Sequence, residues 1–243
     1  GEIGRGGSGR VLRVVDDAQE TAPERALKVL PFGTLADDRA VRRMQREGDV
    51  LRALDHPGIV RVLDAGEGEH GPWVVMEAVD GTSLAERLER ARQESGEAPL
   101  ALANGDATED PWRRVARFGV AHADAASAAH AAGLLHRDIK PSNVLVTEDD
   151  APVLIDFGLA VIEGSSSLTR TGDLVGTPHY MAPEQARGAR ADARTDVWGL
   201  GAVLYEMCTL RRPVEAVEPL AAIEVLRRER PPRLARRGGV PRP

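Results

Sequence analysis

Short apolar runs dominate the first third of the chain, and longer periodic segments follow them. Runs at residues 9–15, 26–30, 59–65 and 73–78 are rich in apolar and β-branched residues, which predicts strands. Residues 38–54 interrupt these runs with Val41, Met44, Leu51 and Leu54 at the spacing of one helical stripe. Glu47 falls on the same stripe, and because an unpaired carboxylate is costly to bury, we expect a cationic partner for it.

Helical patterns take over from residue 81 onward. Residues 95–110 combine glycine, acidic and small residues without periodicity, which predicts an exposed insertion. Residues 112–132 then predict a helix that packs closely through small side chains, with these residues on one face: Val115, Phe118, His122, Ala125 and Ala129.

Two short apolar segments, residues 143–146 and 153–156, are joined by an acidic turn around Asp149 and Asp150. If they pair as an antiparallel hairpin centred on that turn, Asn143 and Asp156 become direct neighbours. Two oxygen ligands at one point suit Mg²⁺ shared with a substrate phosphate. The alternative is an ordinary hairpin whose ends carry polar residues.

Composition restricts the class of protein. With 243 residues, 42% hydrophobic and 29% charged, the chain is of ordinary globular composition and large enough for one good core or two small ones. Cys208 is the single cysteine, which excludes an internal disulfide, and we interpret it as a buried, inert thiol. No cluster of cysteines and histidines has the spacing of zinc ligands, and no apolar run is long enough to span a membrane.

Charge adds two observations. The net charge is −6, yet residues 227–243 carry seven arginines against one acid, which indicates a solvated, linker-like end or a basic segment near a membrane. Of the 32 basic residues only Lys28 and Lys140 are lysines. Lysine is a compact ammonium on a flexible stem, whereas arginine is a planar fork, so these two positions suggest point-charge contacts to phosphate oxygens.

Residues 4–11 match the pattern G-x-G-x-x-G-x-V between two strand-like segments. Glycines let the backbone approach phosphates closely, and the valine can cover a planar base. A dinucleotide-binding turn has the same glycine spacing, but a strand follows here where that fold places a helix, which argues against it.

Three further motifs follow along the chain: His136-Arg137-Asp138 through Asn143, Asp156-Phe157-Gly158 and Ala182-Pro183-Glu184. Together with the glycine-rich loop, Lys28 and Glu47, and in this order, they make the chain resemble the eukaryotic-type serine/threonine protein kinases of bacteria. The resemblance covers essentially the whole chain and implies an α+β, two-lobed fold. Residues 1–77 are expected to form an N-lobe of antiparallel sheet plus one helix, and residues 78–243 a mainly helical C-lobe, with the domain incomplete at both ends.

The resemblance implies catalytic roles for four of these residues and magnesium binding for two others. Lys28 would hold the α- and β-phosphates of ATP and pair with Glu47. Asp138 would be the catalytic base, and Lys140 would steady the γ-phosphate. Asn143 would bind magnesium together with Asp156.

The resemblance also implies where the nucleotide lies. Met76 would be the gatekeeper beside the adenine, and residues 77–79 the hinge. The full set of nucleotide-binding candidates is Ile3, Gly4, Gly6, Gly9, Val11, Ala26, Lys28, Met76, Glu77, Ala78, Val79, Leu145 and Asp156.

Other residues are expected to support the site. By the same resemblance, Leu51, His136 and Phe157 belong to an apolar spine that joins the lobes. Asp196 would anchor the backbone of the catalytic loop. Glu184 would pair with a later arginine, for which the chain has no clear counterpart.

Arg137 directly precedes Asp138, a combination that in this family indicates control by phosphorylation of the activation loop. Thr169 and Thr171 are the candidate acceptors, and a flexible polar loop without that role is the alternative. Thr177 is expected to contact Asp138 and Lys140 instead.

The expected function is transfer of the γ-phosphate of Mg-ATP to serine or threonine hydroxyls of proteins. Expected partners are protein substrates and a second copy of the chain, through autophosphorylation in a transient dimer. No nucleic acid is expected, the expected location is the cytoplasm, and any membrane attachment would come from segments outside this chain. One alternative is a nucleotide-binding pseudokinase scaffold. Such a scaffold usually lacks the lysine, the catalytic base or a magnesium ligand, and this chain keeps all of them. Another is a small-molecule phosphotransferase, which would lack the motif at Ala182.

Overall fold

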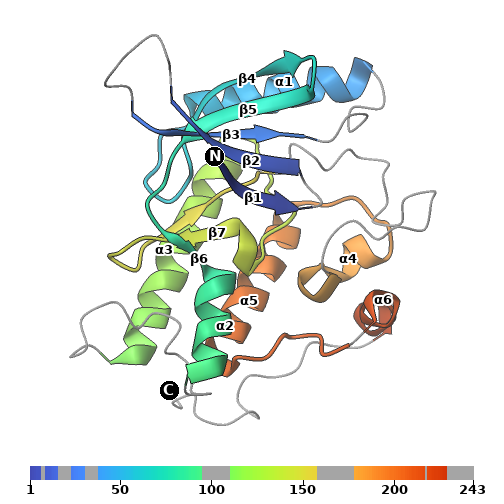
Figure 1. Cartoon of the computed structure of the whole chain (residues 1–243). Coiled ribbons are helices and arrows are strands. Elements are labelled where there is room, and N and C mark those ends of the chain that lie inside the picture. Colours follow the sequence, from blue (N-terminus) through green and yellow to red (C-terminus); the bar gives the residue numbers. More distant parts are fainter. Residues whose placement is uncertain are drawn as a thin grey trace.

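The computed structural model describes residues 1–6, 9–15, 23–30, 38–94, 110–157, 178–216 and 218–228. An antiparallel sheet with one helix forms the first part of the molecule, and helices dominate the second part (Figure 1). This arrangement confirms the predicted α+β fold with a sheet-rich N-terminal part and a mainly helical C-terminal part. The expected insertion at residues 95–110 lies outside the described residues except for Asp110.

The N-terminal sheet has five antiparallel strands in the order β1-β2-β3-β5-β4. Their bounds are β1 Glu2–Gly6, β2 Gly9–Val14, β3 Arg25–Val29, β4 Val62–Gly68 and β5 Gly71–Glu77. The strand predicted to begin at residue 59 begins three residues later. Ile59 instead forms an isolated parallel bridge with Leu154, so this residue joins the N-terminal part to the C-terminal part.

Helix α1, Asp38–Ala53, packs over strand β4 (Figure 1). Leu51 is 2% exposed, which confirms that the predicted apolar stripe faces the sheet at this turn. The side chains of Val41 and Met44 lie outside the described part of the helix.

Gly9 is required by the fold itself. Its φ is +125°, and a Cβ atom on it would lie 2.3 Å from the carbonyl oxygen of Val29. Any side chain would therefore collide with the end of strand β3, and the left-handed conformation favours glycine as well. The tight β2–β3 approach thus explains this glycine before any ligand is considered.

The C-terminal part is built from α2 Leu84–Glu94, α3 Pro111–Ala131, α4 Pro183–Ala186, α5 Ala193–Thr209 and α6 Pro219–Arg228, with 3₁₀ turns η2 Pro141–Asn143 and η3 Pro178–Tyr180. Asp110 caps α3 by accepting from the backbone N–H groups of Trp112 and Arg113. In the described part of the chain, none of the helices is both long and apolar enough to cross a bilayer. The predicted face of α3 is confirmed, since all of these residues are at most 5% exposed: Val115, Phe118, His122, Ala125 and Ala129.

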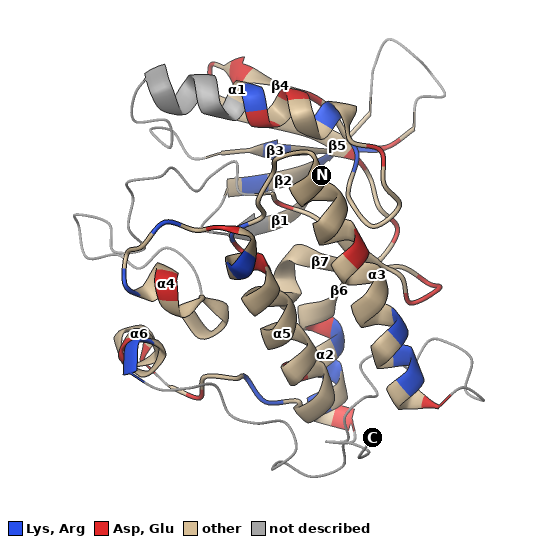
Figure 2. Ribbon diagram, turned by 180° about the vertical axis from the view of Figure 1, so that it is seen from behind, with Lys and Arg blue, Asp and Glu red and all other residues tan. Residues whose placement is uncertain are grey.

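Helix α5 is the central helix of this part. Most of its length is uncharged, with Arg194 and Asp196 near its amino-terminal end (Figure 2). Gly199 packs against Ile139, because a Cβ there would lie 2.8 Å from the Cβ of Ile139. Cys208 is buried on α5, which confirms the predicted burial, and this burial raises the pKa of its thiol.

A second, small antiparallel sheet contains β6 Thr82–Ser83, β7 Val144–Val146 and β8 Pro152–Leu154. Val144 pairs with Leu154, and the backbone N–H of Ile155 donates to the carbonyl of Asn143 at 3.0 Å. The predicted direct pairing of Asn143 with Asp156 is therefore wrong by one residue. Three residues, 148–150, form the turn, and Asp150 adopts a left-handed φ of 57°, as in three-residue hairpin loops.

Candidate active site

The catalytic-loop backbone is anchored by Asp196, at the start of helix α5. Its two carboxylate oxygens accept from the backbone N–H groups of His136 (2.9 Å) and Arg137 (2.7 Å). His130 contacts the same carboxylate at 2.7 Å. Asp196 is 1% exposed, so these contacts take place away from solvent. The expected anchoring role of Asp196 is confirmed.

His136 is a structural residue with a defined tautomer. Its Nδ1 accepts from the backbone N–H of Asp138 at 3.3 Å, so its Nε2 carries the proton that is donated to the carbonyl of Ile155 at 2.9 Å. Its ring lies 4.7 Å from the ring of Phe157. Both residues are buried in or beside the main core, which also contains Leu51, in agreement with the expected apolar spine.

The side chains of Lys140 and Asn143 both donate to the carboxylate of Asp138. The Nζ of Lys140 donates to Asp138 Oδ2 at 2.7 Å, and the Nδ2 of Asn143 donates to the same oxygen at 3.1 Å. Asn143 also donates to the backbone carbonyl of Asp138 at 2.8 Å. The Asp138 side chain remains 43% exposed. The result is a carboxylate that is held by two donors and still partly exposed to solvent.

Lys28 lies on β3 and pairs with Asp156, whose Oδ1 is 2.8 Å from the lysine Nζ. The two side chains are 8% and 18% exposed. Asp156 follows strand β8 and has a left-handed φ of 63°, which turns the chain at this point. An ammonium in the N-terminal sheet therefore meets a carboxylate of the C-terminal part.

The expected pair between Lys28 and Glu47 is wrong for this structure. Glu47 Oε1 instead lies 3.2 Å from Nη1 of Arg137, and these side chains are 20% and 14% exposed. The half-buried guanidinium of Arg137 needs an anion, and the carboxylate of Glu47 supplies it. The expectation that Glu47 has a cationic partner is confirmed, but that partner is Arg137.

The adenine-site candidates lie on adjacent strands. Ala26 and Met76 are direct partners in the β3–β5 pairing, and both are buried. Val11 and Leu145, from different parts of the molecule, pack against the same core cluster. The backbone N–H of Glu77, in the expected hinge, donates to the carbonyl of Arg61 at 3.0 Å.

The remaining candidates are more open or not described. Ile3 is 52% exposed, Gly4 pairs with Val11, and Val79 is partly buried against the core. Ala78 is exposed, and Gly6 pairs with Gly9 where β1 meets β2. The candidate phosphorylation sites Thr169 and Thr171, as well as Thr177, lie outside the described residues.

The donor set around Asn143 and Asp156 fits magnesium in its chemistry. The amide nitrogen of Asn143 is held by Asp138, whereas its Oδ1 accepts only a long hydrogen bond of 3.5 Å from the hydroxyl of Ser142. Asp156 has a second carboxylate oxygen besides the one that lies 2.8 Å from Lys28. Carboxylate and amide oxygens are ligands that Mg²⁺ accepts together with substrate phosphates. No group of three or more histidine, cysteine, aspartate or glutamate side chains with metal-ligand geometry occurs among the described residues.

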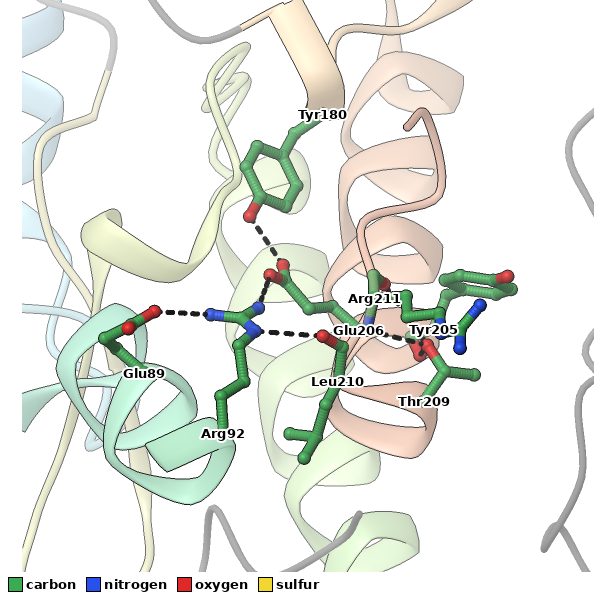
Figure 3. Close-up of polar contacts among 8 residues, drawn as sticks. All are labelled: Glu89, Arg92, Tyr180, Tyr205, Glu206, Thr209, Leu210 and Arg211. Atoms are coloured by element: carbon green, nitrogen blue, oxygen red, sulfur yellow. Dashed lines mark hydrogen bonds and ion pairs between the residues drawn. The ribbon is translucent and has the colours of Figure 1, made fainter. Parts of the chain in front are cut away.

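The turn at Tyr180 is bound to the helical core through a buried carboxylate (Figure 3). Tyr180 donates to Glu206 on α5 at 2.5 Å, and Arg92 on α2 forms an ion pair with the other oxygen of the same carboxylate. Glu206 is 2% exposed, and burial together with this carboxylate raises the pKa of Tyr180. The segment that leads into α4 is therefore held by both α5 and α2.

Glu184 accepts a hydrogen bond at 2.7 Å from the hydroxyl of Thr195, which is the contact that the structure gives in place of a later arginine. Three of these contact residues were not predicted from the sequence: Arg92, Glu206 and Gln185. A glutamate inside the apolar run of α5 was a detectable signal for Glu206, since a buried carboxylate needs partners. The signal for Gln185 was its place as the third residue of a helix, where a glutamine side chain can accept from the backbone N–H at the cap.

The comparisons agree with this geometry. Residues 1–232 match the family model described as the protein kinase domain. Serine/threonine-protein kinase pkn3 of Myxococcus xanthus is 38% identical over 97% of this chain, and the probable serine/threonine-protein kinase PknB of Lactococcus lactis is 36% identical over 90% of it. The chain spans 42% and 32% of the lengths of these relatives.

A solved structure gives the same result. The crystal structure of the Mycobacterium tuberculosis PknI kinase domain is 30% identical to this chain, with a TM-score of 0.67, over 97% of this chain and 78% of that one. The family match covers nearly all of the residues, the two relatives are 38% and 36% identical over the aligned residues, and the two-part fold agrees. This chain therefore belongs to the protein kinase domain family, with bacterial serine/threonine kinases among its relatives.

Proposed function

We propose that the chain catalyses transfer of the γ-phosphoryl group of Mg-ATP to serine or threonine hydroxyls of proteins. The observation that carries the proposal is the Asp138 carboxylate, which is open to solvent and held by Lys140 and Asn143. Phosphoryl transfer depends mainly on positioning and electrostatic stabilisation, and these contacts provide both.

In the proposed step the hydroxyl oxygen of the protein substrate forms a bond to the γ-phosphorus, while the bond from that phosphorus to the β–γ bridging oxygen breaks. The hydroxyl proton goes to Asp138, and ADP leaves with the bridging oxygen. Lys140, 2.7 Å from Asp138, lies where its ammonium can stabilise charge that spreads over the transferred group. Asp138, Lys140, Lys28 and Glu47 are thus the proposed catalytic residues.

ATP is proposed to lie between the N-terminal sheet and strand β7. Val11, Ala26 and Leu145 would contact the adenine beside Met76, and Lys28 would hold the α- and β-phosphates. Asn143 and Asp156 would bind Mg²⁺, which neutralises phosphate charge when present. This chain would contribute the side-chain oxygens of Asn143 and Asp156 and the ammonium of Lys28. Lys28 is buried, with 6% of the residue exposed.

Control by phosphorylation is part of the proposal. Arg137 holds Glu47 in this structure, and Lys28 holds Asp156. A phosphate on Thr169 or Thr171 is a doubly charged anion, and it would compete with Glu47 for Arg137. Glu47 would then be free to pair with Lys28, and Asp156 would be free for magnesium. The substrates would be cytoplasmic proteins, including a second copy of this chain in a transient dimer.

The test is incorporation of labelled γ-phosphate into the protein itself and into a generic basic protein, with Lys28→Met as the comparison. We expect label with the wild-type protein and a loss of more than about tenfold with Lys28→Met, because a single lost charge contact in the site exceeds about 1.4 kcal/mol. A wild-type protein that binds ATP but transfers no phosphate in any phosphorylation state would support the pseudokinase alternative. Equal labelling by both proteins would refute the role of Lys28.

A further inference from the structure

Gln185, the third residue of helix α4, uses both ends of its side-chain amide. Its Oε1 accepts from the backbone N–H of Ala182 at 2.9 Å, and its Nε2 donates to the backbone carbonyl of Arg137 at 2.9 Å. The orientation of the amide is determined by these partners, since a flipped amide would set donor against donor and acceptor against acceptor. One side chain therefore connects the start of α4 to the catalytic loop.

The choice of glutamine is informative. At the third position of a helix, either glutamate or glutamine can accept from the backbone N–H at the cap, as in a capping box. Ala182, at the cap, has no side-chain oxygen that could reciprocate, so the local cap needs only an acceptor at residue 185. An ionised glutamate would meet that need but has no proton to donate to Arg137. The amide nitrogen thus serves the catalytic loop and not the helix.

The carbonyl that Gln185 holds belongs to the peptide between Arg137 and Asp138. Arg137 has a left-handed φ of 65°, which is unfavourable for a residue with a side chain. Asp196 binds the N–H of Arg137, and Gln185 binds its carbonyl, so the two contacts fix the peptides on both sides of this residue. A strained conformation persists where its surroundings determine it in this way.

The support of Gln185 is itself held in place. Tyr180 binds the buried Glu206, and Glu184 accepts from Thr195 on α5. Helix α4 also packs against α6, and Arg227 donates to the carbonyl of Ala186 at 2.6 Å. Gln185 therefore donates to the catalytic loop from a segment with several independent attachments.

We propose that Gln185 is a positioning residue that orients the Asp138 carboxylate through the preceding peptide. The inference rests on the proposed role of Asp138 as the catalytic base. Loss of the donor should let the peptide rotate, which misplaces Asp138 and lowers kcat. The KM for ATP should stay within about twofold, because neither Ala182 nor Arg137, the hydrogen-bond partners of Gln185, is a proposed nucleotide-binding residue, and misplacement acts on the chemical step.

Gln185→Glu is the sharpest variant, because it keeps the acceptor for Ala182 and loses the donor to Arg137. At pH 8 we expect kcat about tenfold below wild type, a modest share of what misplacement of a reacting group can cost. A carboxyl with the ordinary glutamate pKa of about 4.3 stays ionised between pH 8 and 6, so the ratio of wild-type to variant kcat should stay near tenfold across this range. Gln185→Met lacks both contacts and should stay impaired at every pH.

Gln45→Glu on the exposed side of α1 is the matched control, with the same chemical change and an expected kcat ratio of about one at each pH. ADP binding and thermal unfolding show whether each variant is folded. If Gln185→Glu does not fold, a folded Gln185→Met with lowered kcat and unchanged KM for ATP supports the proposal, and one with wild-type kcat overturns it.

A wild-type kcat for Gln185→Glu, or an effect confined to KM, would overturn the positioning role. Failure of the proposed function looks different, because the wild-type protein would then transfer no phosphate. An active wild-type protein with an unaffected Gln185→Glu variant refutes this inference alone.

Discussion

The carboxylate of Glu47 lies 3.2 Å from the guanidinium of Arg137, 90 residues further along the chain. This ion pair joins helix α1 to the catalytic loop one residue before Asp138. Lys28, which the kinase resemblance assigns to Glu47, binds Asp156 instead at 2.8 Å. In the arrangement expected for transfer, Lys28 instead pairs with Glu47, which leaves Arg137 for a phosphorylated loop and Asp156 for magnesium.

Removing the side-chain charge of Arg137 should make the rate of phosphoryl transfer less dependent on phosphorylation of the chain. Arg137→Met releases Glu47 and also removes the group that would bind a phosphorylated loop. We expect the ratio of activity before and after phosphatase treatment, at least about fivefold in the wild-type protein, to approach one in this variant. Transfer rates measured on both forms, with phosphorylation followed by mass spectrometry, test this. An unchanged ratio would contradict the exchange of partners, and Arg113→Met on the exposed side of α3 is the control.

Arg87 and Asp150 form a deeply buried ion pair between α2 and the β7–β8 turn, with side chains 6% and 2% exposed. Arg87 also donates to the carbonyls of Val146 and Thr147. Arg87→Leu should lower the free energy of unfolding by about 3–5 kcal/mol, because it leaves a buried charge without a partner. Denaturant unfolding measures this, and Arg13→Leu, whose ion pair is exposed, should have little effect.

The Arg87–Asp150 pair also shows whether the unpaired buried charge is the cause of the lost stability. Asp150→Asn removes the charge and keeps a residue that tolerates the left-handed φ of 57°. Combining it with Arg87→Leu should therefore recover part of the lost stability. Additive losses in the double variant would mean that the uncompensated charge is not the source of the effect.

His122 predicts a dependence of stability on pH. It is fully buried on α3, neither ring nitrogen has a hydrogen-bond partner in the described structure, and burial, with a smaller contribution from His136, lowers its pKa to about 3. In the unfolded chain the pKa is about 6.5, so between these values the unfolded state binds more protons than the folded state. The stabilising contribution is complete above pH 6.5 and is lost progressively as the pH falls toward 3.

His122→Leu should therefore flatten the pH dependence of stability. Between pH 6.5 and 4.5 the wild-type protein should lose up to about 1.4 kcal/mol per pH unit more than the variant, since one pKa unit corresponds to that free energy. Unfolding by urea at several pH values gives both slopes. Parallel slopes would show that His122 is protonated or hydrated in the folded protein.

Tyr180 and Tyr205 provide a matched comparison. The Tyr180 hydroxyl donates to the buried carboxylate of Glu206, whereas the buried Tyr205 hydroxyl has no hydrogen-bond partner in the described structure (Figure 3). Tyr180→Phe should lower the free energy of unfolding by about 1.5–3 kcal/mol, as expected for a hydrogen bond to a charged group. Tyr205→Phe should be neutral or stabilising. Equal effects of the two changes in denaturant unfolding would argue against an important Tyr180–Glu206 bond.

Periodicity and motif order predicted much of this molecule. The spacing of small residues in residues 112–132 identified the buried face of α3, and the strand patterns identified four strands of the sheet within a few residues. These features are local, because they depend on which side of one element meets the core. The placement of Asp196 beneath the catalytic loop followed from the family resemblance.

Features that depend on long-range geometry could not be predicted in the same way. The pairing of Glu47 with Arg137 depends on which of two nearby cations the end of α1 approaches, and no local pattern records that distance. The hairpin register depended on a left-handed φ at Asp150, which shifted the partner of Asn143 by one residue. Gln185 acts through a backbone carbonyl. Because every residue has such a carbonyl, the sequence does not show which one a side chain will bind.

The central claim is that Asp138 accepts the substrate proton while ATP is held by other residues. Single-turnover transfer of labelled γ-phosphate, measured together with the Kd for ATP, tests this in the wild-type protein and in Asp138→Asn. The amide retains an acceptor for Lys140 but cannot take the proton. We predict that transfer slows by at least about 100-fold, the usual contribution of a general base, while the Kd for ATP stays within about threefold. Transfer by Asp138→Asn at the wild-type rate would contradict the account.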